Sequence, residues 1–173
     1  MPTSTAGRLN NRSGFTLIEL MLVILLLGMM AGLIMPLISG FDPNRLNSSA
    51  SRLAGTVKYL YNEAAMTGQE HRLIFNFDKA AYHAEKINAL GEWVPLLGVG
   101  DEHKLGEGVR FVNIYQPGKG ERSDGEVTTT LLPGGWLEET IIYLQDKNDK
   151  KLTLRLVPLT GRTQIFDGFR SFR

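Results

Sequence analysis

SGFTLIELMLVILLLG, residues 13–28, sets a single carboxylate, Glu19, into an otherwise apolar run. Residues 20–38 contain no charged side chain. As a helix at about 1.5 Å per residue, a run of that length covers roughly 28 Å, close to the ~30 Å hydrocarbon core of a bilayer. Core helices of soluble domains are amphipathic, whereas this run is apolar on every face. We therefore predict that residues 15–38 form a transmembrane helix.

The residues before this run predict its orientation. Residues 1–14 contain two arginines, Arg8 and Arg12, and no acid. Positive charge beside a span favours the cytoplasmic side, which places the rest of the chain across the membrane. A secretory signal peptide is the alternative, but its apolar region is usually about 7–15 residues long and precedes a small-residue cleavage site. This run is longer, and no such site follows it.

The segment GFTLIEL, residues 14–20, resembles the processing site of type IV pilins and type II secretion pseudopilins. The motif is specific because it joins a basic leader, Gly-Phe, a glutamate at fixed spacing and an uninterrupted apolar run. The resemblance implies that a prepilin peptidase removes residues 1–14 by cutting after Gly14. It also implies that Phe15 becomes the N-terminus and is methylated on its amine.

Glu19 needs its own explanation. A carboxylate at the centre of a bilayer costs about 2.5–3.5 kcal/mol or more, and such residues usually have a partner and a function. Glu19 lies near one end of the run, so one interpretation is that it simply reaches the interface. The sharper hypothesis is that it pairs with the Phe15 amine of a neighbouring subunit in a filament core, where each charge offsets the other.

Three residues within the span indicate helix packing or bending. Gly28 and Gly32 form a G-x-x-x-G, a spacing that lets helices approach closely, although it also arises by chance in apolar helices. Pro36 predicts a kink or local loosening near the end of the span. The family resemblance extends to a proline at this place.

A second helical pattern covers residues 39–68. We predict that this segment is an amphipathic continuation of the first helix, either continuous with it or interrupted near residues 39–43. Its apolar positions recur at spacings of three and four and form one stripe: Leu46, Ala50, Leu53, Val57, Leu60 and Ala64. Gly68 follows as a C-cap. A core-facing helix explains this stripe better than a coiled coil, because it is only about three heptads long.

Residues 69–173 read as an antiparallel β domain. Strands are predicted at residues 73–77, 82–87, 109–115, 127–132, 141–145, 151–157 and 163–166. Residues 116–126 read as an exposed loop, and residues 146–150 as the turn of a hairpin. The predicted fold class is α+β: a long N-terminal helix, its first half transmembrane, packed on an antiparallel sheet as in pilins.

The downstream chain also resembles the GspH/FimT group, more loosely. The matching features are the helix at residues 51–69, Pro133-Gly134 before a late hairpin, and Thr160-Gly161-Arg162 near the end. This resemblance implies a minor pseudopilin of the type II secretion system at the tip of a periplasmic pseudopilus. Its partners would be other major and minor pseudopilins and the inner-membrane assembly platform. It would be a single-pass inner-membrane protein with a periplasmic domain before joining the pseudopilus.

Nothing in the sequence predicts an enzyme, a cofactor or a metal site. Cysteine is absent, and the net charge of +1 gives no strong field for nucleic acid. His71, His83 and His103 have no metal-ligand spacing, and no nucleotide-binding or nucleophile motif is present. Asp146, Asn148 and Asp149 suggest calcium, which some pseudopilins bind, but neighbouring lysines oppose it, so we interpret the segment as a solvated turn.

The C-terminus offers a second function. GRTQIFDGFRSFR combines three arginines with three phenylalanines, a composition that can bind a nucleic-acid backbone and stack on bases: Arg162, Arg170 and Arg173, with Phe166, Phe169 and Phe172. The alternative interpretation is a last strand with core phenylalanines and solvated arginines. FimT-like minor type IV pilins are associated with pilus assembly and DNA uptake, and some are richer in arginine here. Gln164 stands where another arginine would strengthen that reading.

Overall fold

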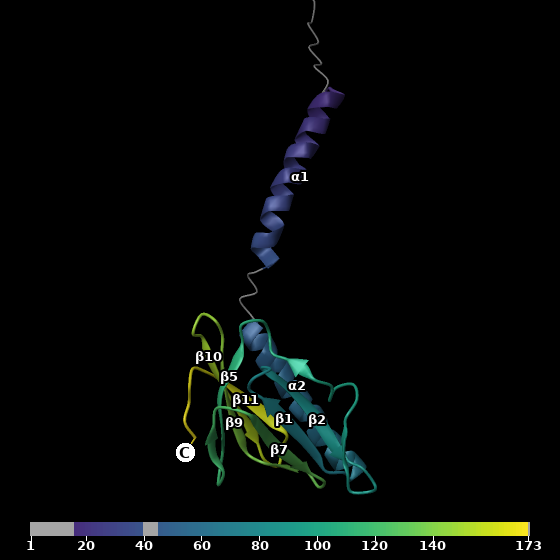
Figure 1. Ribbon diagram of the computed structural model, residues 1–173, viewed down its shortest axis with the longest axis vertical. Coiled ribbons are helices and arrows are strands. Elements are labelled where there is room, and N and C mark those ends of the chain that lie inside the picture. Colours follow the sequence, from purple (N-terminus) through teal and green to yellow (C-terminus); the bar gives the residue numbers. More distant parts are fainter. Residues whose placement is uncertain (1–15, 40–44, 173) are drawn as a thin grey trace, which may run out of the picture. The chain divides into compact units, whose positions relative to one another are not determined.

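The computed structural model describes residues 16–39 and 45–172, and the side chains of residues 16–30 and 45–172. The chain forms two compact units, Met1–Asp42 and Pro43–Arg173. Helix α1 (Leu17–Ser39) belongs to the first unit, and helix α2 (Arg45–Thr67) opens the second (Figure 1). The strands that follow are β1 (His71–Asn76), β2 (Ala81–Ile87), β3 (Trp93–Pro95), β4 (His103–Lys104), β5 (Arg110–Gln116), β6 (Gly120–Arg122), β7 (Glu126–Leu132), β8 (Trp136–Leu137), β9 (Thr140–Gln145), β10 (Lys151–Val157) and β11 (Arg162–Asp167).

Helix α1 has the composition that the sequence predicted. It runs without interruption through Pro36, and all its described side chains, at residues 17–30, are exposed. Over the described residues, no helix is long and apolar enough to cross a membrane. The membrane span therefore stays a prediction. The junction at residues 40–44 lies outside the described residues, so the predicted continuity of the two helices is not tested.

Helix α2 confirms the predicted apolar stripe. All six stripe residues are buried, Leu53, Leu60 and Ala64 completely. Helix α2 ends at Thr67, and Gly68 follows in the left-handed region with φ +68°. Its amide donates to Ala64 O at 3.1 Å, so glycine closes the helix as expected.

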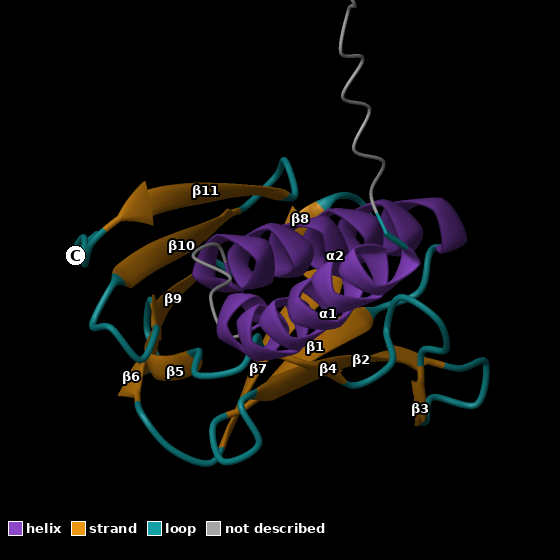
Figure 2. Ribbon diagram, turned by 90° about the horizontal axis from the view of Figure 1, so that it is seen from above, coloured by secondary structure: helices purple, strands orange, loops and turns teal. Residues whose placement is uncertain are grey.

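The strands form two antiparallel sheets. The first has the order β3-β2-β1-β7-β8, with β4 also pairing with β2, and the second has the order β11-β10-β9-β5-β6. Helix α2 contacts strands of both sheets (Figure 2). Every predicted strand is present within a few residues. The predicted loop at residues 116–126 is wrong in part, because β6 returns from the Pro117-Gly118 turn and pairs with β5.

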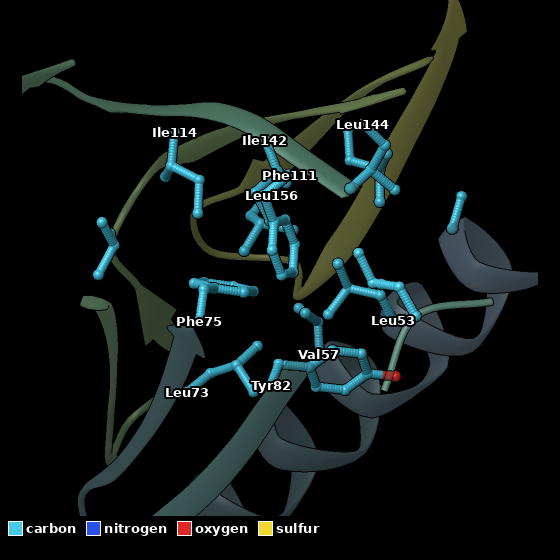
Figure 3. Close-up of a cluster of buried hydrophobic side chains, with 14 of the residues drawn as sticks. Leu53, Val57, Leu73, Phe75, Tyr82, Phe111, Ile114, Ile142, Leu144 and Leu156 are labelled. Atoms are coloured by element: carbon cyan, nitrogen blue, oxygen red, sulfur yellow. The ribbon is translucent and has the colours of Figure 1, made fainter. Parts of the chain in front are cut away.

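The two sheets and α2 share one hydrophobic core (Figure 3). Leu53 and Val57 of α2 meet Leu73, Phe75 and Tyr82 of the first sheet and Ile142, Leu144 and Leu156 of the second. Phe75 and Phe111 join the sheets edge to face, with ring centroids 5.7 Å apart. Burying apolar surface stabilises the fold by roughly 25 cal/mol per Å². This burial is the main force that holds α2 against the sheets.

A buried polar contact also links the sheets. Thr129 of the first sheet and Thr140 of the second have their Oγ1 atoms 2.8 Å apart. The side chain of Gln116 donates from Nε2 to Thr128 O at 3.0 Å and to Thr140 Oγ1 at 3.2 Å. Because a buried polar group must find partners, these contacts fix how the sheets face each other.

The hairpin of β9 and β10 confirms the predicted turn at residues 146–150. Asp146 Oδ1 accepts from the backbone amides of Asn148 at 2.8 Å and Lys150 at 2.9 Å. Asp149 adopts φ +60°, which aspartate tolerates better than most residues. The Asp146 carboxylate therefore shapes the turn itself.

Candidate functional site

The first candidate site is the start of α1, where Thr16 and Glu19 form a capping box. Glu19 N donates to Thr16 Oγ1 at 3.3 Å, and Thr16 N donates to Glu19 Oε2 at 3.1 Å. The Thr16 hydroxyl also donates to Glu19 Oε2 at 3.2 Å. This reciprocal pair satisfies two amides that the helix start would otherwise leave without partners.

The capping box gives Glu19 a local role that the sequence reasoning missed. The spacing T-x-x-E ahead of an apolar run is a readable signal for it. Gly14 and Phe15 lie outside the described residues. The pairing of Glu19 with an amine of another subunit therefore stays a prediction.

The G-x-x-x-G is described only in part. A Cβ built on Gly28 would meet no atom within 4 Å, so this face of α1 is open to a close neighbour. Gly32 and Pro36 lie further along the same helix. A packing role for these three residues stays a prediction.

The second candidate site ties α2 to two turns of the β domain. The Tyr61 hydroxyl lies 2.5 Å from Leu159 O and 2.8 Å from Gly135 O. Lys58 Nζ, one helical turn earlier, donates to Thr160 O at 3.0 Å. One helix face therefore holds the turn between β7 and β8 and the turn between β10 and β11.

Gly161 shows why this turn needs glycine. It is buried and has φ +59°, and a Cβ there would lie 2.3 Å from Tyr61 Cγ. Any side chain would therefore displace the Tyr61 ring. The sequence analysis names Thr160-Gly161-Arg162 only as a feature shared with the GspH/FimT group and does not identify its partner Tyr61. Nothing local in the sequence around Tyr61 signals the contact, which joins residues about a hundred positions apart.

The third candidate site is the C-terminal segment, which is bound to the second sheet. Thr153 of β10 is fully buried, and its hydroxyl donates to Gly168 O at 2.7 Å and accepts from Arg170 N at 3.0 Å. The Tyr143 hydroxyl of β9 donates to Arg170 O at 3.0 Å. These bonds hold residues 168–170 beside β9 and β10.

The aromatic side chains of this segment contact cationic side chains of the segment itself and of β10. The Arg170 guanidinium lies 4.6 Å from the Phe166 ring centroid, and that of Arg155 lies 5.0 Å from the Phe172 ring centroid. The expected core phenylalanines are a wrong prediction, because Phe166, Phe169 and Phe172 lie outside the core, and Phe169 is 44% exposed. Arg162 is exposed on β11. Arg173 lies outside the described residues.

The remaining polar residues give no sign of a reactive centre. Within residues 16–39 and 45–172, no three histidine, aspartate or glutamate side chains lie together as metal ligands. Glu139 pairs with Arg155 at 2.6 Å, while its neighbour Glu138 pairs with Lys119. The adjacent acids thus point to different partners. His71 is buried, with Nδ1 2.9 Å from Gln69 O.

Known proteins match this chain both in its N-terminal segment and in its fold. The prokaryotic N-terminal methylation motif matches residues 9–35. The minor pseudopilin EpsH of the Vibrio cholerae type II secretion system has the same fold, with a TM-score of 0.60 at 16% identity, covering 74% of this chain and 97% of that one. The minor type IV pilin FimU of Pseudomonas aeruginosa matches with a TM-score of 0.51 at 18% identity, covering 72% and 90%.

A methylation motif followed by this fold makes the chain similar to the class of type IV pilin-like proteins, so the resemblance carried by GFTLIEL and the predicted fold are confirmed. Within that class, the chain is similar to the type II secretion system protein H of Pseudomonas aeruginosa, with 36% identity over 97 residues. The match covers 54% of this chain and 54% of that relative, about half of each.

Proposed function

We propose that this protein is a minor pseudopilin of a type II secretion system, built into the tip of the pseudopilus that drives export of folded proteins. One observation carries the proposal: a single chain joins the methylation motif to a domain with the EpsH fold and is 36% identical to protein H over half its length. The protein acts by packing and by presenting its β domain, with no catalysis of its own.

The proposed maturation begins in the inner membrane. The chain crosses it once, with its N-terminus in the cytoplasm and the β domain in the periplasm. Prepilin peptidase removes residues 1–14 after Gly14 and methylates Phe15. The apolar α1 then moves from the bilayer into the filament core, beside α1 of other pseudopilins. Mass spectrometry of the chain from cells with the peptidase should find methylated Phe15 at the N-terminus. An uncut chain would contradict this scheme.

Glu19 is proposed to guide this transfer by pairing with the Phe15 amine of a neighbouring subunit. The capping box shows how to separate this role from helix capping. Glu19→Gln keeps a side chain that accepts from Thr16 N but removes the charge, whereas Glu19→Val removes both. Both variants should insert into the membrane and both should be lost from sheared filaments. If Glu19→Gln assembles normally, capping rather than charge pairing is the role of Glu19.

A FimT-like minor type IV pilin that binds DNA is the alternative. Its support is the exposed Arg162 and the fold shared with FimU. Against it, the Arg170 guanidinium already lies over the Phe166 ring, and Gln164 interrupts the arginine pattern. A gel shift with the full chain in detergent at two salt concentrations tests it. Salt-sensitive binding lost in Arg162→Ala but kept in Arg122→Ala, another exposed arginine, would favour the alternative.

Gene deletion decides between the two systems. A strain without this protein should lose exoprotein secretion while keeping twitching and DNA uptake, and the intact gene should restore secretion. Normal secretion with lost uptake would overturn the proposed function.

A further inference from the structure

A loop interrupts one edge of the first sheet. Strands β3 and β4 both pair with β2, and residues 96–102 connect them (Figure 2). Both ends of this loop bond to the same residue of β2. Leu96 N donates to Ala84 O at 3.0 Å, and Ala84 N donates to Gly100 O at 2.8 Å. The loop therefore leaves the sheet and returns to it at Ala84, and we call residues 96–102 the edge loop.

Several contacts fix the base of the edge loop. Gly100 is buried, and a Cβ there would lie 2.4 Å from Leu96 O, so the close approach of the two ends requires glycine. The Leu96 side chain belongs to the hydrophobic core. On the β3 side, the Arg72 guanidinium lies 4.2 Å from the Trp93 ring centroid and pairs with Glu85 at 2.5 Å. These contacts anchor the loop to the sheet.

The middle of the edge loop presents apolar side chains to solvent. Leu97 is 81% exposed and Val99 is 40% exposed. Protection of the sheet edge against an added strand does not account for them, because the loop itself and Pro95, which has no amide hydrogen, already interrupt that edge. Two exposed apolar side chains on an anchored loop are instead suited to binding a partner.

The charges around the edge loop indicate the chemistry of that partner. Residues 88–102 contain three acids, Glu92, Asp101 and Glu102, and no lysine, arginine or histidine. All three acids are exposed. Lys79 pairs with Glu102 at 3.1 Å, whereas the other two acids form no ion pair with described residues. Negative charge repels the phosphates of nucleic acids and of anionic lipids. A protein recess that is apolar inside and carries lysine or arginine at its rim complements both features of the loop.

We propose that the edge loop inserts Leu97 and Val99 into an apolar recess, rimmed by lysine or arginine, on a different pseudopilin of the same filament. This proposal rests on the proposed function, which supplies such neighbours. The carboxylates of Glu92 and Asp101 face the basic rim. Because the loop is anchored before it binds, docking orders few additional groups and loses little conformational entropy.

Photo-cross-linking tests the contact in cells. The full chain, with p-benzoylphenylalanine in place of Leu97, is expressed in a strain that lacks the natural gene, and the cells are irradiated. We expect a cross-linked product whose second protein is identified by mass spectrometry as another pseudopilin. The same residue in place of Leu159, which is 71% exposed in the β10–β11 turn, is the matched control and should not give this product.

Three outcomes of this experiment would overturn the proposal. The first is no product from position 97. The second is a product only with a second copy of this chain, or only with a protein that is not a pseudopilin. The third is an equal yield of the same product from positions 97 and 159, which would mean that the contact is not specific to the edge loop.

Charge reversal tests the basic rim. Asp101→Lys, combined with the cross-linker at position 97, should lower the yield of the product by about tenfold, because it places like charges in contact. Asp124→Lys makes the same change at an exposed acid of another loop and should leave the yield unchanged. Equal yields from the two variants would overturn the proposed rim.

Secretion separates this proposal from the proposed function. Leu97→Glu should lower exoprotein secretion, while its unfolding midpoint stays near that of the wild type because the site is exposed. If the intact gene restores secretion to the deletion strain and Leu97→Glu restores it equally, the docking proposal is overturned and the proposed function stands. If the intact gene does not restore secretion, the proposed function fails, and the cross-link from position 97 still tests the contact itself.

Discussion

Helices α1 and α2 have the same length, 23 residues, and opposite patterns of side-chain exposure. Every described side chain of α1 is exposed, although nearly all are apolar. Helix α2 is more polar overall, yet eight of its residues are buried against the sheets. The difference shows that α2 is stabilised within its own domain. An exposed apolar surface of this kind is what the predicted membrane span or filament core would cover.

The largest expected effect tests that contrast directly. Leu60→Ala empties a fully buried site of α2 and should lower the free energy of unfolding of the β domain by about 2–5 kcal/mol. Leu22→Ala in α1 removes the same atoms from an exposed site and should leave it unchanged. Urea unfolding followed by tryptophan fluorescence measures both. A comparable loss in Leu22→Ala would mean that α1 stabilises the domain.

A smaller effect is expected where α2 meets the turns. Gly161→Ala should destabilise the domain by about 2–3 kcal/mol, because its Cβ overlaps the Tyr61 ring and its φ of +59° disfavours a side chain. Gly134→Ala is the matched control, with φ +94° and no atom within 4 Å of the added Cβ. Its loss should come from backbone conformation alone and be smaller. Equal losses of stability in the two variants would mean that overlap with the Tyr61 ring does not contribute to the effect of Gly161→Ala.

Tyr82, under α2, gives a pH-dependent effect. Burial raises the pKa of its hydroxyl, with Thr56 and Arg52 of α2 partly opposing the rise. The unfolded chain therefore releases this proton first, and stability falls as the pH rises above the unfolded value of about 10, by up to ~1.4 kcal/mol per pH unit until the folded pKa is reached. Tyr82→Phe should remove that part of the decline. Unfolding midpoints of the wild type and of Tyr82→Phe at pH 8 and pH 11 measure this difference. If both proteins lose the same stability between the two pH values, the prediction is contradicted.

The smallest expected effect is at the start of α1. Glu19→Val removes the capping box, worth about 1 kcal/mol to the helix start, and Glu19→Gln keeps it. Amide exchange of the first turn of α1 in micelles should rise only in Glu19→Val. Neither variant should change the unfolding of the β domain, and a change there would mean that α1 affects the stability of that domain.

The sequence predicted best what is local and periodic. The α2 stripe, its glycine cap and the β9–β10 hairpin are confirmed because each depends on residues close together in the chain. It missed β6, a three-residue strand in a polar segment, because pairing with β5 rather than local composition makes it a strand. The roles of Tyr61 and of the C-terminal segment were also missed, since their partners are distant in sequence.

The contacts of Tyr61 have a mechanical consequence. In the proposed pseudopilus, load entering the β domain through α2 would pass into the sheets. The Tyr61 hydroxyl contacts a carbonyl oxygen in the β7–β8 turn and another in the β10–β11 turn. These turns belong to different sheets. One side chain therefore divides an axial force between both sheets, so that neither sheet carries it alone.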